Sequence, residues 1–149
     1  MTVTESIFRR VIVPVANEED ATATVEAVAP YVDAPGVTVT VVHVIEKAGG
    51  APDKASVEQR EQYAREVFAA ITDGLDGVAA SLETELLYGT DVAATIIDAA
   101  HDKDATAIVF TPRGGSRWRQ LLTGDVAHKL VETSDVPVVV LPDREASDA

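Results

Sequence analysis

From residue 107 the chain reads Ala107-Ile108-Val109-Phe110-Thr111-Pro112-Arg113-Gly114-Gly115, and later Gly124-Asp125-Val126. Four apolar residues in a row, rich in β-branched and aromatic types, predict a strand that is buried on both faces. Thr-Pro and Gly-Gly then end this strand in a loop. A helical pattern follows Gly124-Asp125, so the stretch as a whole predicts a strand, a glycine-bearing loop and the start of a helix.

The loop in this stretch has the chemistry of an anion site. A glycine-bearing loop that leads into a helix N-terminus offers backbone N–H groups and a positive dipole end to a phosphate. The loop also carries Arg113, Arg117 and Arg119, and no acidic residue occurs from residue 105 through residue 124. Arginine binds phosphate bidentately. The alternative is that these arginines pair with surface carboxylates of the same chain.

The rest of the composition is acidic and restricts the partners. The 149 residues include 25 Asp and Glu but only 12 Lys and Arg, for a net charge of −13, which suits a salt-rich cytoplasm. Neutralising phosphates takes clustered basic residues, so we expect neither a nucleic acid nor an anionic membrane as a partner. The absence of cysteine excludes disulfides and thiolate metal sites. No signal sequence and no apolar run of about 18 residues is seen, and we therefore expect a cytoplasmic protein.

Apolar periodicity predicts an α/β fold. Five strands are expected near residues 10–15, 37–45, 81–86, 107–110 and 136–141, separated by four helical segments. Connections longer than any hairpin imply an open, mostly parallel sheet with helices on both faces. Leu82, Thr84 and Leu86 alternate with polar residues, which places their strand at a sheet edge. Asp91 is expected to cap the third helix, and Ser56 to open the second through a capping box.

Several of these segments resemble those of universal stress proteins. The matching segments are Val13-Pro14-Val15, His43-Val44, Gly89-x-Asp91 and Val136-Pro137-Val138-Val139-Val140. The resemblance covers about residues 8–142, leaving 143–149 as a polar tail, and implies a single domain over residues 1–149. It implies the strand order 3-2-1-4-5, with a nucleotide crevice between the first and fourth strands, and a homodimer.

The nucleotide signature of that family is only partly present. It reads Gly, two residues, Gly, nine residues, Gly, then Ser or Thr; its second and third glycines fall on Gly114 and Gly124. Thr111 replaces the first glycine, Asp125 replaces the Ser or Thr, and Ala16 stands where nucleotide-binding members usually carry Asp. By resemblance, the crevice residues are Pro14, Ala16, Val44, Phe110, Thr111, Arg113, Gly114, Gly124, Asp125 and Val126.

Asp125 is the most consequential of the three changes. A carboxylate ~4 Å from a phosphate oxygen costs about 4 kcal/mol at an effective dielectric constant near 20, or about a thousandfold in affinity. Mg²⁺ could bridge the two groups and remove much of that cost. Without the ion, Asp125 is expected to cap its own helix.

These observations leave two main functional hypotheses. The first is a dimeric regulatory or stress-response binding module with a degenerate crevice, weak or no ATP binding and an unknown protein partner. The second is a switch that binds ATP or AMP, with at most slow hydrolysis, in which the loop from Arg113 to Arg119 holds the phosphate or another small anion. No Gly-x-Ser-x-Gly elbow and no histidine spacing for a metal site occurs, so the sequence favours binding over catalysis.

The last strand is the expected dimer contact. It is apolar and carries Pro137 near its start, which suits a sheet edge. The resemblance implies that two such strands pair antiparallel across a twofold axis, which would hide the edge. The predicted contact residues are Val136, Val138, Val139, Val140 and Leu141.

Overall fold

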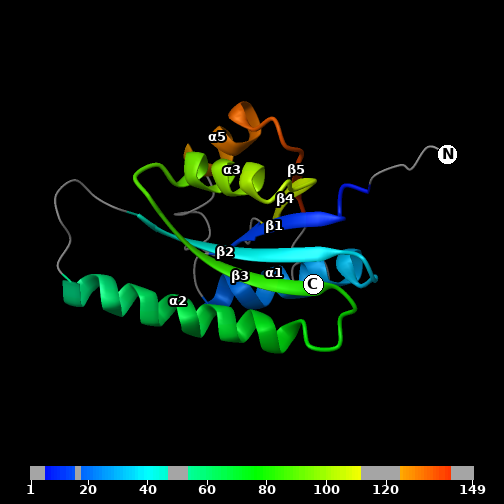
Figure 1. The fold of residues 1–149 in the computed structure, drawn as a ribbon, viewed down its shortest axis with the longest axis horizontal. Coiled ribbons are helices and arrows are strands. Elements are labelled where there is room, and N and C mark those ends of the chain that lie inside the picture. The colour runs from blue at the N-terminus through cyan, green and yellow to red at the C-terminus, as the bar shows by residue number, and fades with distance from the viewer. Residues whose placement is uncertain (1–5, 16–17, 47–53, 112–124, 142–149) are drawn as a thin grey trace, which may run out of the picture.

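Five parallel strands form one sheet in the order β3-β2-β1-β4-β5, which confirms the predicted fold class (Figure 1). The computed structural model describes residues 6–15, 18–46, 54–111 and 125–141. In chain order the elements are β1 (Arg10–Pro14), α1 (Glu18–Val32), β2 (Thr38–Glu46), α2 (Lys54–Gly74), β3 (Ser81–Gly89), α3 (Val92–Asp102), β4 (Ala107–Phe110), α5 (Asp125–Thr133) and β5 (Val138–Val140).

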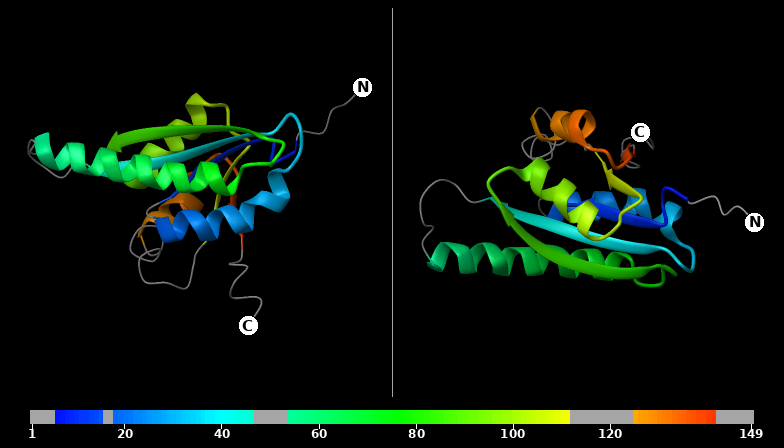
Figure 2. Two further views of the ribbon diagram at one scale, coloured as in Figure 1. Left: turned by 90° about the horizontal axis from the view of Figure 1, so that it is seen from below. Right: turned by 45° about the horizontal axis from the view of Figure 1, so that its top comes forward.

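The sheet is covered on both faces by helices. Helices α1 and α2 lie on one face, and α3 and α5 lie on the other (Figures 1 and 2). Successive side chains of a strand point to opposite faces, so β1 supplies Val11 and Val13 to the α1–α2 side and Ile12 to the α3–α5 side. All three are at most 2% exposed. Burial of both faces explains why the central strands read as continuous apolar runs.

The strand β3 forms one edge of the sheet, as its alternating pattern predicts. It pairs with β2 along its whole length, from Thr38↔Ser81 to Glu46↔Gly89. Two of its carboxylates are held by Lys103, which follows α3: the Nζ atom lies 3.6 Å from an oxygen of Glu83 and 3.2 Å from an oxygen of Glu85. This edge is therefore charged and tied to the helix layer.

The two helix starts predicted from capping residues have different outcomes. The prediction for α3 is confirmed, because the Asp91 carboxylate accepts a hydrogen bond from the N–H of Ala94 at 3.1 Å. The prediction for α2 is wrong, because the helix begins at Lys54, two residues before Ser56. Lys54 and Ala55 are good helix formers, and helix propensity extends the first turn past the capping-box signal.

Candidate functional site

The strand order places a crevice at the carboxyl ends of β1 and β4. These two strands are neighbours, but β2 lies on the far side of β1 and β5 on the far side of β4. The helices α1 and α5, which come after β1 and β4, therefore lie on opposite faces, and the carboxyl ends of the strands at such a point are where open parallel sheets bind ligands. The pairs Val11↔Ala107 and Ile12↔Ile108 set the register, so Pro14 and Phe110 end their strands at the same level.

The rim formed by β1 is held in place by β2. Val15, the first residue after the strand, donates its N–H to the carbonyl of Val42 at 3.0 Å. Its own carbonyl lies 3.0 Å from Nδ1 of His43. Burial lowers the pKa of His43 and outweighs the opposite effect of this hydrogen bond. The ring is therefore neutral at pH 7, and since a carbonyl only accepts, we assign the proton to Nδ1.

The rim formed by β4 ends in a buried hydroxyl. Phe110 is 1% exposed, and its carbonyl accepts a hydrogen bond from the N–H of Leu141 at 2.9 Å. Thr111 follows it and is fully buried. Among the described residues its Oγ1 atom has no hydrogen-bond partner, and a buried hydroxyl without one costs about 1–3 kcal/mol relative to a satisfied hydroxyl. A side chain thus occupies the interior at the position where the family signature has glycine.

The third part of the crevice is the start of α5. The helix begins at Asp125, so the carboxylate-bearing residue is in the first turn, at the positive end of the helix dipole. Val126 is half-buried and packs against the core on the α3–α5 side. Lys129, one turn further on, has its Nζ atom 3.7 Å from the Asp91 carboxylate that caps α3. The starts of α3 and α5 are therefore linked.

The structure places six of the ten predicted crevice residues. Pro14, Phe110 and Thr111 lie at the carboxyl ends of β1 and β4. Val44 lies near the end of β2, half-buried against the α3–α5 side, and Asp125 and Val126 open α5. The remaining four lie outside the described residues: Ala16, Arg113, Gly114 and Gly124.

A residue that the sequence did not mark for this rim is His43. The sequence predicts only that His43 lies in the second strand, and the structure confirms this. Its bond to the carbonyl of Val15 depends on the pairing of Pro14 with Val42. Because of this register, His43, which follows Val42, lies beside Val15, which follows Pro14. Hydropathy carries no such information, although a histidine within the otherwise apolar run from Val41 to Ile45 is the one signal that was available.

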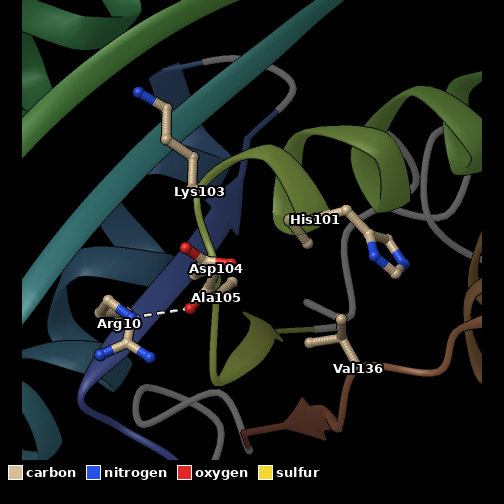
Figure 3. A pocket seen from close by; sticks show the side chains of 7 residues that line it. Arg10, His101, Lys103, Asp104, Ala105 and Val136 are labelled. Carbon is tan, nitrogen blue, oxygen red and sulfur yellow. Dashed lines mark hydrogen bonds between the residues drawn. The ribbon is translucent and has the colours of Figure 1, made fainter.

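A second hollow lies at the opposite, amino end of the sheet. Its volume is about 680 Å³, and its lining includes the Asp104 carboxylate and the nitrogen-bearing side chains of Arg10, His101 and Lys103 (Figure 3). Each of the three nitrogen-bearing side chains is engaged within the chain. Arg10 Nε donates to the carbonyl of Asp104 at 2.7 Å, His101 Nε2 lies 2.7 Å from the Asp135 carboxylate, and Lys103 holds the two glutamates of β3.

Figure 3 also shows that Lys103 and His101 point away from one another. The hollow therefore lacks a convergent set of charges for an anion. The topology favours the carboxyl end as the ligand site.

Among the residues that the structure describes, no group of three or more His, Asp or Glu side chains is arranged to hold a metal ion. None of the helices within those residues combines the length and the apolar character that crossing a membrane requires.

Known structures resemble this chain over nearly its whole length. The universal stress protein from Archaeoglobus fulgidus in complex with dAMP is 25% identical, with a TM-score of 0.63 over 91% of this chain and 99% of that one. The protein UspA from Lactobacillus plantarum is 21% identical, with a TM-score of 0.70 over 92% and 99%. A universal stress protein in complex with cAMP is 15% identical, with a TM-score of 0.68 over 91% and 97%. Since the last two are below 25% identity, they support the fold alone.

No match to the chain was found among curated proteins. The match to a family is nevertheless direct and extends from residue 7 to residue 142. Both the sequence match and the strand order agree with the resemblance seen in the local motifs. This chain belongs to the universal stress protein family.

Proposed function

We propose that this chain is a dimeric regulatory binding module, of the stress-response type, whose crevice binds ATP weakly or not at all. Adenine nucleotides are the ligand class to test, since one similar universal stress protein is in complex with dAMP and another with cAMP. The affinity of this chain for such a ligand depends on its own crevice residues, and we propose no identity for its protein partner.

The observation that carries the proposal is the burial of Thr111. Glycine at this position would leave the end of β4 open to close approach by a ribose or phosphate. Thr111 instead buries its side chain completely, and its hydroxyl has no hydrogen-bond partner within the part of the chain that the structure describes. Asp125 adds a negative charge at the start of α5, where a phosphate would otherwise gain from the helix dipole. Both changes oppose nucleotide binding, one by filling space and the other by charge.

The alternative is a switch that binds ATP or AMP. Three arginines between residues 113 and 119, in a stretch without carboxylates, would offset the charge of Asp125. Mg²⁺ bound between Asp125 and the phosphates would do the same. Under this alternative Pro14, Val44, Phe110 and Val126 would line the crevice around the nucleotide, and hydrolysis would be slow at most.

The first test restores the family pattern at the two changed positions. We expect the double variant Thr111→Gly/Asp125→Ser to bind ATP about tenfold to a thousandfold more tightly than the wild type, measured by isothermal titration calorimetry. The matched control is Asp135→Ser, which removes a carboxylate beyond the other end of α5 and should leave affinity unchanged. Equal affinity in the double variant and the wild type would refute the idea that these two residues close the crevice.

The second test separates the two functions by asking whether the purified protein carries a nucleotide and whether added ATP stabilises it. The protein is purified in molar salt, denatured, and any small molecule released is identified by mass spectrometry, for the wild type and for Arg113→Ala. We expect no nucleotide, and no rise in melting temperature on adding ATP with Mg²⁺. An adenine nucleotide released near one per chain from the wild type, and lost in Arg113→Ala, would establish the switch instead.

The proposed dimer contact is the outer edge of β5. Within the described residues, β5 pairs only with β4, through Ile108↔Val138, Val109↔Val139 and Phe110↔Val140. Val140 is 49% exposed, whereas Leu141 is buried in the chain's own core. Val136, Val138 and Val139 are half-buried against the two cores. Antiparallel pairing of two β5 strands would cover Val140 and satisfy the edge.

A further inference from the structure

The carbonyl of Val15 is the last backbone group on the crevice side of β1 that the structure describes. The register of β1 with β2 ends at Pro14↔Val42, and the N–H of Val15 still donates to β2 through Val42. Val15 itself is 1% exposed. A buried carbonyl needs a donor, because leaving it unpaired costs about 1–3 kcal/mol.

That donor is a side chain. His43 Nδ1 lies 3.0 Å from the carbonyl oxygen, so the imidazole of β2 supplies the bond at the point where the strand pairing ends. Val15 is thereby held to β2 from both of its backbone groups, its N–H by Val42 and its carbonyl by His43. This second bond fixes the orientation of the Val15 carbonyl.

The ring is itself fixed by the helix layer. Tyr63 of α2 meets it edge-on, with ring centroids 6.5 Å apart and planes at 68°. Two residues earlier in α2, Glu61 accepts a hydrogen bond from the hydroxyl of Tyr88, near the end of β3. Two contacts therefore anchor this half of α2 to the carboxyl ends of the strands, and the first of them limits rotation of the imidazole.

We infer that His43 is a positioning residue of the crevice: its Nδ1–H holds the carbonyl of Val15 and so sets the geometry of the β1 rim beside Pro14. The role in ligand binding rests on the proposed function, whereas the hydrogen bond itself does not. His43 acts through the backbone of Val15, so its effect is on the shape of the site.

A pair of nearly isosteric variants separates positioning from packing. In His43→Asn the amide nitrogen stands where Nδ1 stood and can still donate, whereas His43→Leu fills similar space without a donor. Both are made in the Thr111→Gly/Asp125→Ser background, where ATP binding is expected to be measurable. We expect Leu to weaken ATP binding about five- to tenfold and Asn to stay within about twofold of that background.

Melting temperatures show whether weaker ATP binding reflects a general loss of stability. Leucine gains apolar burial at this half-buried position but leaves the Val15 carbonyl without its donor, and these two effects oppose each other, so the Leu and Asn variants should melt at similar temperatures while the Leu variant binds ATP less well. A merely structural role predicts that affinity follows melting temperature. Equal affinities of the Leu and Asn variants would overturn the inference.

Nuclear magnetic resonance provides a readout that needs no ligand. Long-range ¹H–¹⁵N spectra of the wild type should show the neutral ring protonated at Nδ1, and the ¹³C shift of the Val15 carbonyl should change in His43→Leu but largely return in His43→Asn. A ring protonated at Nε2 alone would overturn the inference. If the double variant fails to bind ATP, the idea that Thr111 and Asp125 close the crevice fails, while these spectra still decide the role of His43.

Discussion

The two edges of the sheet differ in length and in chemistry. The edge strand β3 spans Ser81–Gly89 and carries two glutamates that are held by Lys103. The edge strand β5 spans only Val138–Val140, is entirely valine and leaves Val140 half exposed. Unpaired edges invite association with other chains, and charge on an edge opposes it. The edge at β3 is therefore guarded by charge against pairing with other chains, whereas the edge at β5 is suited to such pairing.

The largest effect is expected from a charge on the apolar edge. In Val140→Asp, dimerisation would bring two carboxylates into an interface that excludes water, which costs several kcal/mol. We expect the dimer dissociation constant to rise by about a thousandfold, measured by analytical ultracentrifugation or light scattering at high salt.

The guarded edge offers the control for this variant. Thr84→Asp adds the same charge at an exposed position of β3 and should leave the dimer unchanged. If both variants were monomers, the association would depend on net charge and not on β5. A wild type that is monomeric at micromolar concentration and high salt would remove the dimer proposal altogether.

A smaller effect is expected when the guarded edge loses its charges. In Glu83→Val/Glu85→Val the long edge of β3 becomes apolar and β-branched, like that of β5. We expect larger assemblies to form at about tenfold lower protein concentration than for the wild type, followed by light scattering. Assembly no greater than that of a Thr84→Val control would show that other features, and not these carboxylates, guard the edge.

The smallest effect is expected from the cation that holds those carboxylates. The pairs of Lys103 are exposed, with side-chain exposures of 37% for Lys103, 53% for Glu83 and 40% for Glu85. Such ion pairs contribute little, so Lys103→Met should lower the free energy of unfolding by about 0.5 kcal/mol. Chemical denaturation measures this difference, which should shrink in molar salt.

The stability difference between the wild type and Lys103→Met should also depend on pH. The hydrogen bond to Glu85 and the charge of that residue raise the pKa of Lys103. A raised pKa means that the stabilisation is complete below the unfolded value of about 10.4 and is lost as the pH rises through the folded value. The difference between wild type and Lys103→Met should therefore be constant from about pH 6 to about pH 9 and vanish at higher pH. A difference that persists at high pH would point to lost packing of the lysine stem.

The sequence predicted most of the fold because the fold depends on apolar patterns. The runs at Val11–Val13 and Ala107–Phe110 are buried on both faces, and the alternation of Leu82 with its neighbours marked an edge. The cap at Asp91 was also predictable, because its partner, the N–H of Ala94, is three residues away. Local signals of this kind need no knowledge of the tertiary structure.

The site was less predictable because its contacts join distant segments. The bond from His43 to Val15 spans 28 residues and depends on the register of two strands. The burial of Thr111 depends on how the end of β4 is covered, which no local pattern encodes. The pairing of Lys103 with β3 likewise follows from where α3 ends above the sheet. The roles of Ala16, Arg113, Gly114 and Gly124 stay predictions.

The position of β1 at the centre of the sheet also has a kinetic consequence. Its neighbour on one side, β2, follows closely in the chain, but on the other side Arg10 bonds to Thr106, 96 residues later. Pairing across so long a loop is slow, because the entropy of closing it is lost before the contacts form. During synthesis on the ribosome, β1, β2 and β3 are complete well before β4 emerges. For most of its synthesis the growing chain therefore leaves unpaired the backbone edge of β1 that β4 covers in the finished protein, and such an edge is open to pairing with other chains.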